Sequence, residues 1–286
     1  KLELSKVKLN YNDLAVGKLD FNLQQLANPQ YAGEVEFSKL QLNALLDQFK
    51  IAQAARKDLH LLDNISFKGN LSGDKNNLTV KDLSFNFADK LKGKTSVVVK
   101  DFAKPSYSGS LDLEKFNLNQ LLDSLNIAVA ARKNKPLLNN FAISSNGFSG
   151  DMQNISLKGL QISAGDSLKA SFGTLKVQNF SNPSVSGDVS LPTFNLNQTL
   201  DGLGIAVAER KNKPLLNSFA FSGGFNATPT AANLSNVKIS AGGLVNATLG
   251  KLAVQNFSKP SVSGDINLPT FNLNKTLDGL GIAVAE

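Results

Sequence analysis

A repeat of about 77 residues constrains the fold of this chain more than any other feature. Four X-Pro turns place Pro29, Pro105, Pro183 and Pro260 at separations of 76, 78 and 77 residues. A second marker is a four-residue segment that ends in Leu-Asn. It recurs with the same period, at 40–43, 116–119, 194–197 and 271–274. Equal spacing of this kind is typical of tandem structural units that stack on one another.

The period divides the chain into units. We expect a partial repeat over 1–40, repeats over 41–115, 116–193 and 194–270, and the start of a further repeat over 271–286. All five segments are predicted to belong to one continuous repeat domain. We interpret the chain as a fragment of a longer protein.

Within a unit the apolar residues alternate with polar ones, which is the period of a strand with one buried face. The alternation slips once in the second strand, between Leu234 and Val237. It slips at the equivalent place in other units, for example between Val80 and Leu83, which predicts a β-bulge kept in register. Counting three strands in the partial unit and four in each repeat, we expect fifteen strands. The predicted fold is mainly β: an elongated, curled antiparallel sheet, or β-groove.

One short helix is expected in the longer connection that follows each fourth strand. In the third repeat, Asn197 is the candidate N-cap, Leu196, Leu200 and Leu203 stand at helical spacing, and Gly204 is the candidate C-terminal stop. Asn126 and Gly281 hold the same stop position, and both tolerate the left-handed conformation. Lys50 tolerates it less well, so the first helix is expected to end differently.

Several kinds of chemistry are not expected from the composition. With no Cys, the chain has no disulfide, thiolate metal site or thiol nucleophile. His60 is the only histidine, and its repeat equivalents are Pro136 and Pro214, so we predict no catalytic site, metal or cofactor. The net charge of +7 would suit nucleic acid, but the Lys residues are scattered without aromatic neighbours, so no nucleic-acid partner is expected.

The one-sided strands raise the question of what covers their apolar face. A two-turn helix at one end of the strands is too small to do so. Either the sheet closes on itself as a sandwich with an ordinary core, or it forms a trough whose lining binds something apolar. Phe suits such a lining, because it has no polar group to satisfy. The residues predicted to line it are Phe67, Phe85, Phe87, Phe141, Ile143, Ile162, Phe172, Val177, Phe219, Phe221, Phe225 and Ile239.

The stretch from Phe194 to Ile205, followed by Leu215-Leu216 and by Phe219 to Gly223, resembles the repeat of the AsmA-like family of bacterial envelope proteins. The resemblance implies a periplasmic protein that is anchored to the inner membrane by a helix outside this sequence. It also implies a β-groove that carries phospholipids, held by their acyl chains, between the inner and outer membranes. The family's groove unit usually has five strands, whereas four are counted here.

Three hypotheses follow for the function. The first is the lipid conduit, with envelope proteins as partners at its ends. The alternative is a structural or assembly factor that assists outer-membrane protein biogenesis by binding partner proteins through the sheet edge. The third is an adhesin-like surface array. Basic tracts at 56–57, 132–135 and 210–213 either attract lipid phosphates or are solvated loops.

Overall fold

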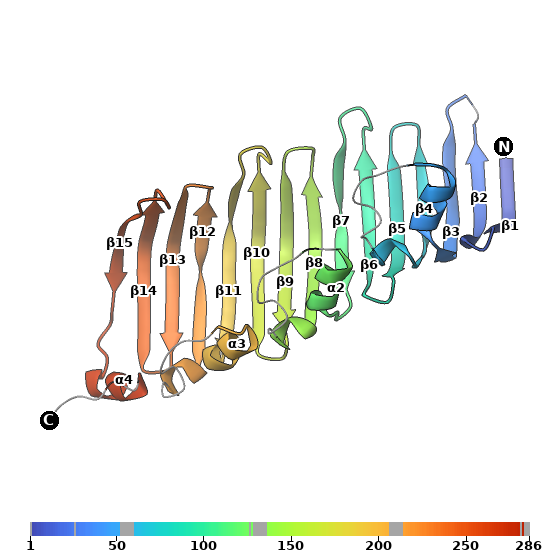
Figure 1. The fold of residues 1–286 in the computed structure, drawn as a ribbon. Helices are drawn as coiled ribbons and strands as arrows, with labels where there is room; N and C mark the ends of the chain where they lie inside the picture. Colours follow the sequence, from blue (N-terminus) through green and yellow to red (C-terminus); the bar gives the residue numbers. More distant parts are fainter. Residues whose placement is uncertain are drawn as a thin grey trace. The chain divides into compact units, whose positions relative to one another are not determined.

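In the computed structural model, residues 2–25, 27–51, 60–125, 127, 136–205, 214–280 and 282 are described. Their fifteen strands form one antiparallel sheet in which each strand lies beside the strand that precedes it (Figure 1). The strands are β1 (Leu2–Tyr11), β2 (Ala15–Gln24), β3 (Gln30–Leu40), β4 (Ile65–Asp74), β5 (Leu78–Phe87), β6 (Leu91–Lys100), β7 (Ser106–Leu113), β8 (Phe141–Gly150), β9 (Ile155–Ala164), β10 (Leu168–Gln178), β11 (Ser184–Phe194), β12 (Phe219–Ala227), β13 (Ala231–Ala241), β14 (Val245–Gln255) and β15 (Ser261–Asn267).

The helices of the described residues are all short. They are α1 (Leu42–Gln48), α2 (Leu118–Ser124), α3 (Leu196–Gly202) and α4 (Leu273–Gly279), with 3₁₀ turns η2 (His60–Leu62), η4 (Pro136–Asn139) and η6 (Pro214–Asn217). The predicted fold class is therefore confirmed: a mainly β antiparallel sheet of fifteen strands with one short helix in each long connection. The alternative of a two-sheet sandwich is wrong, because all the described strands belong to one open sheet. The curl and the repeat boundaries stay predictions.

The chain splits into two compact units. Unit 1 comprises 1–130 with 142–152, and unit 2 comprises 131–141 with 153–286. Each unit is compact by itself and has its own two sheet faces.

Unit 1 separates apolar from polar side chains onto opposite faces. Residues paired directly across an antiparallel ladder lie on the same face. One such row is Leu4, Phe21, Gly33, Leu71, Val80, Val97, Gly109 and Phe148, from β1 to β8. A row on the opposite face is Glu3, Asn22, Ala32, Ser72, Thr79, Val98, Ser108 and Ser149. The first row belongs to what we term the apolar face, and the second to the polar face.

Unit 2 repeats this separation. Its apolar face carries the row Leu157, Leu175, Gly187, Phe225, Leu234, Leu252 and Gly264. Its polar face carries the row Gln161, Ser171, Ser190, Ser222, Lys238, Thr248 and Asn267. Each unit is thus a sheet with one face of each kind.

The predicted slip in the second strand is a β-bulge with a left-handed residue. Lys6, Asp82 and Asn236 have φ values of 52°, 53° and 50°, and the pairing shifts register at each of them. Gly159 holds the equivalent place in β9 with φ 57°, although its pairing with β10 stays regular. One extra residue reverses the alternation of side chains, so the bulge returns the apolar residues on both sides of it to the apolar face.

Two details of the helices correct the sequence predictions. The N-cap of α3 is Asn195, whose side chain accepts a hydrogen bond from the Gln198 N–H at 2.9 Å. Asn197 was the wrong candidate, because it is the second residue of the helix and its side-chain amide donates to Asn217 Oδ1 at 2.9 Å. Lys50 adopts the left-handed conformation, with φ 56°, so the first helix is followed by the same stop as the third, where Gly204 has φ 68°. Asn126 and Gly281 lie outside the described residues.

The helices lie at one end of the strands, termed the helix end, and the X-Pro turns lie at the other, termed the turn end (Figure 1). At the helix end of unit 2, Leu137 of η4 packs against α3, and Leu215 of η6 packs against α4. The apolar residues buried in the described part of the chain are Leu61, Ile65, Phe116, Leu121, Leu137, Leu160, Ala164, Leu215, Val237 and Ala241. All lie in the helices, in the 3₁₀ turns and the segments beside them, or in strands between the bulge and the helix end.

The chain exposes far more surface than a chain of its mass with a central core. Its accessible surface is 17526 Å². A compact monomer of this mass exposes about 11,800 Å². Most apolar side chains of the strands therefore remain within reach of solvent or of a ligand.

Candidate functional site

The apolar face of each unit is the strongest candidate for a binding site. The twelve residues predicted to line a groove are all half-buried. Strand pairing places ten of them on the apolar face; for example, Phe67 pairs with Phe85, and Phe221 pairs with Ile239. The remaining two, Phe141 and Ile143, stand four and two residues before Ser145 in β8 and therefore share its side of the strand. Ser145 pairs with Leu111 of the apolar face.

Aromatic rings cluster along this face. The ring centroids of Phe37 and Phe67 are 5.2 Å apart, and those of Phe194 and Phe219 are 5.7 Å apart. The sequence prediction omitted Phe37 and Phe194, as well as Phe21 and Phe148, which pair into the same face. The alternation that selected the twelve residues also marks these four, once the strand pairs are known.

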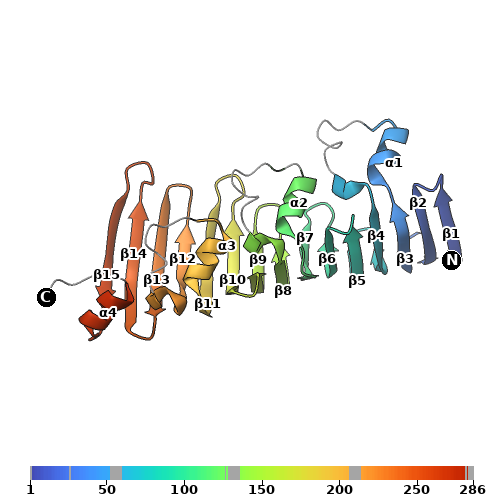
Figure 2. The same cartoon turned by 60° about the horizontal axis from the view of Figure 1, so that its bottom comes forward.

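The face is covered unevenly along the strands. Near the helix end, Ile65 and Ala241 are buried, with exposed fractions of 5% and 6%. Between the bulges and the turn end, the described strand residues are half-buried or exposed. Figures 1 and 2 show a single layer of strands in each unit, with the helices beside one end. The open part of the apolar face is therefore the part that runs toward the turn end.

The polar face contains a feature that the sequence did not predict. In unit 1 it is hollowed over β3 to β8 by about 900 Å³. In unit 2 a hollow of about 540 Å³ lies over β9 to β13. The side chains that line both hollows are mainly Ser, Thr, Asn, Lys, Asp and Glu. These concavities are typical of solvated surface, and they lie on the side opposite the predicted lining.

Charge pairing on unit 1 is local and exposed. Glu34 Oε1 lies 2.9 Å from Lys68 Nζ, and Glu36 Oε2 lies 3.3 Å away, so hydrogen bonds to these carboxylates raise the pKa of Lys68. At the turn end, the backbone N–H of Asn76 and the side chain of Asn77 donate to Asp74 and lower the pKa of its carboxyl. Both are ordinary surface interactions, and neither marks a reactive group.

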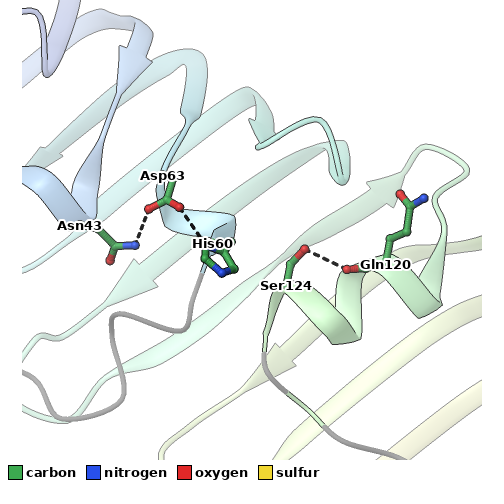
Figure 3. A network of polar contacts seen from close by, with 5 residues as sticks. All are labelled: Asn43, His60, Asp63, Gln120 and Ser124. Atoms are coloured by element: carbon green, nitrogen blue, oxygen red, sulfur yellow. Dashed lines mark hydrogen bonds and ion pairs between the residues drawn. The ribbon is translucent and has the colours of Figure 1, made fainter.

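His60, the one histidine, is exposed. Its Nδ1 atom is 3.2 Å from Oδ2 of Asp63, and Oδ1 of Asp63 accepts a hydrogen bond from Asn43 at 2.7 Å (Figure 3). A separate contact in the same view lies within α2, where the hydroxyl of Ser124 donates to the Gln120 backbone carbonyl at 2.8 Å (Figure 3). The His60 side chain is 74% exposed, so it lacks the enclosed surroundings that shape catalytic histidines.

Arg56, Arg132 and Arg210, with their neighbouring Lys residues, lie outside the described residues. Where the structure describes the chain, it contains no helix long and apolar enough to cross a membrane. No protein-family model, curated protein or solved structure matches the sequence or the fold.

Proposed function

We propose that the apolar face binds the acyl chains of phospholipids and carries these lipids between the inner and outer membranes of a bacterial envelope. In this proposal the protein works in the periplasm and is anchored to the inner membrane by a segment outside this sequence. The observation that carries the proposal is the continuity of the apolar rows within each unit: one row crosses every strand of unit 1, and a separate row crosses the strands of unit 2.

Acyl chains fit such a surface chemically. Each methylene removed from water contributes about 0.8 kcal/mol and needs no hydrogen-bond partner. A row of Leu, Val, Phe and Gly side chains offers no polar group that would hold a lipid at one point. Lipid tails can therefore move sideways from strand to strand without a large barrier, as a conduit requires.

The spacing of the strands gives the length of the path along which lipids would move on one unit. Neighbouring strands lie about 4.8 Å apart, so the row that crosses the eight strands of unit 1 extends for about 34 Å. That length exceeds the size of a single lipid. Several lipids can thus occupy the unit at once and follow one another.

Photocrosslinking tests the proposal with matched pairs of positions. Benzoylphenylalanine replaces Phe148 on the apolar face or Ser149 on the polar face of β8, and likewise Phe225 or Asn226 in β12. The protein is mixed with vesicles of radiolabelled phospholipid and irradiated. We expect labelled adducts from Phe148 and Phe225, and only background from their neighbours.

Equal adducts from both faces would contradict the proposal. The absence of lipid adducts from all four positions would also contradict it. If irradiation in cell envelopes then gave adducts to outer-membrane proteins instead, the alternative of an assembly factor would be favoured.

A further inference from the structure

The two ends of the apolar face differ in what they offer a lipid. The helix end is covered by apolar side chains: in unit 2, Leu137 and Leu215 fill the space between a helix and the adjacent strand turn, and in unit 1 Leu61 and Leu121 are buried there. The turn end has no such cover among the described residues. A lipid on this face therefore meets a closed side and an open one.

Residues suited to a boundary between hydrocarbon and water stand at the turn end. Tyr31 and Tyr107 belong to the outermost apolar row of unit 1, and the Tyr31 hydroxyl donates to the Asn77 carbonyl at 3.2 Å. Tyr has an apolar ring and a polar hydroxyl, so it is enriched at membrane interfaces, where hydrocarbon meets water. Lys100, the last residue of β6, and Lys104, in the adjacent X-Pro turn, are both exposed.

Three of the four X-Pro turns, those at Pro105, Pro183 and Pro260, also present one aromatic ring each. Phe102 in unit 1 and Phe180 and Phe257 in unit 2 are 49%, 48% and 50% exposed. The backbone N–H of each residue donates to a carbonyl of the neighbouring turn, at 3.2, 3.2 and 3.4 Å. The backbone that carries each ring is therefore held at the turn end, where an apolar group beside a charged one matches the upper part of an acyl chain.

The length of the strands fits this arrangement. Strands of ten or eleven residues are about 34 Å long. One leaflet of hydrocarbon is about 15 Å deep, half of a bilayer core. A phospholipid tail laid along a strand from the turn end thus ends near the bulge, before it reaches the covered helix end.

We infer that a bound phospholipid lies parallel to the strands, with its headgroup phosphate at the turn end and its acyl chains pointing toward the helix end. This inference rests on the proposed function, because it assigns an orientation to the lipid on the same face. It also means that headgroups stay beside the X-Pro turns while the lipid moves from strand to strand.

Single tryptophans on β7 test the orientation, since the natural chain has no Trp. Tyr107→Trp places the probe in the outermost apolar row, and Leu111→Trp places it about 14 Å further inward on the same face. Ser108→Trp is the control on the polar face. Each full-length variant is titrated with phosphatidylcholine that carries a nitroxide either on the headgroup or near the end of one acyl chain.

We expect the headgroup nitroxide to quench Tyr107→Trp more strongly than the chain-end nitroxide does, and the reverse order for Leu111→Trp. Ser108→Trp should be quenched weakly by both. A reversed order, or the same ratio at Tyr107 and Leu111, overturns the orientation but leaves lipid binding in place. Quenching of neither apolar-face probe above the control contradicts the proposed function itself. Circular dichroism confirms that each variant retains its strands.

Discussion

A charge placed on the apolar face should stop lipid binding, whereas the same charge one residue away should not. Val97 and Val98 are neighbours in β6 with identical side chains, but Val97 pairs with Val80 and Gly109 while Val98 pairs with Thr79 and Ser108. Replacement of either residue by Asp therefore changes the same atoms on opposite faces. The pair forms an internally controlled experiment.

The expected magnitude follows from the cost of a carboxylate against hydrocarbon. Asp at the centre of a membrane helix costs about 2.5–3.5 kcal/mol, and Val contributes about −0.3 kcal/mol. The difference of about 3 kcal/mol corresponds to about a hundredfold loss of local lipid occupancy. Val98→Asp leaves the carboxylate in water and should cost nothing in binding.

The readout is a photocrosslinker at Phe148, which lies in the same row as Val97, two strands or about 10 Å away. A Cβ built at Gly109, between them, would come within 2.7 Å of the Phe148 ring, so the ring leans over Gly109 toward Val97. The yield of labelled lipid at Phe148 should collapse in Val97→Asp and stay unchanged in Val98→Asp. Equal yields in the two folded variants would refute the assignment of faces, and Val97→Leu should preserve the yield.

Three further predictions concern stability. Leu215→Ala should destabilise the helix end of unit 2 by about 2–5 kcal/mol, because a buried Leu side chain is lost. Amide hydrogen exchange should therefore accelerate in α4, and unchanged exchange there would contradict the packing of Leu215 against this helix. Lys50→Gly should stabilise the end of α1 by about 1 kcal/mol, because the left-handed backbone conformation at this position is strained for Lys but not for Gly. Amide hydrogen exchange in α1 should become slower, and faster exchange would contradict the prediction. The pKa of the Asp74 carboxyl is lowered by its hydrogen bonds, so its contribution to stability is present above about pH 3.9 and is lost as the pH falls through the lower folded pKa. Asp74→Asn should thus flatten the acid limb of a denaturation-against-pH curve, and an unaltered limb would count against this carboxyl.

The sequence predicted features that depend on alternation. Fifteen strands and the bulge at Asp82 and Asn236 follow from a period of two and one slip, because one buried face repeats along each strand. The N-cap was wrong although a signal existed, since Asn195 and Gln198 stand three residues apart, like the ends of a capping box. At Lys50, the expectation followed residue preference, but the local chain path decided the conformation.

The face on which the candidate site lies could be predicted, but its covered and open parts could not. Alternation assigns a side chain to a face, so Phe225 and Ile239 were placed correctly on the apolar side. It cannot show which part of that face a helix covers, because the packing of Leu215 against α4 joins residues about sixty positions apart. The hollows of the polar face were also missed, since they depend on how successive strands bend.

The strand order, in which each strand pairs only with its neighbours along the chain, makes the length of this sheet easy to change during evolution. Insertion of a whole repeat by gene duplication interrupts one strand pair and restores an equivalent pair at each junction. The sequence carries a trace of such copying, because residues 192–209 and 269–286 differ only in having Gln198 where the later copy has Lys275. Under the proposed function, selection can then match the reach of the protein to the width of the compartment it crosses, without inventing a new binding surface.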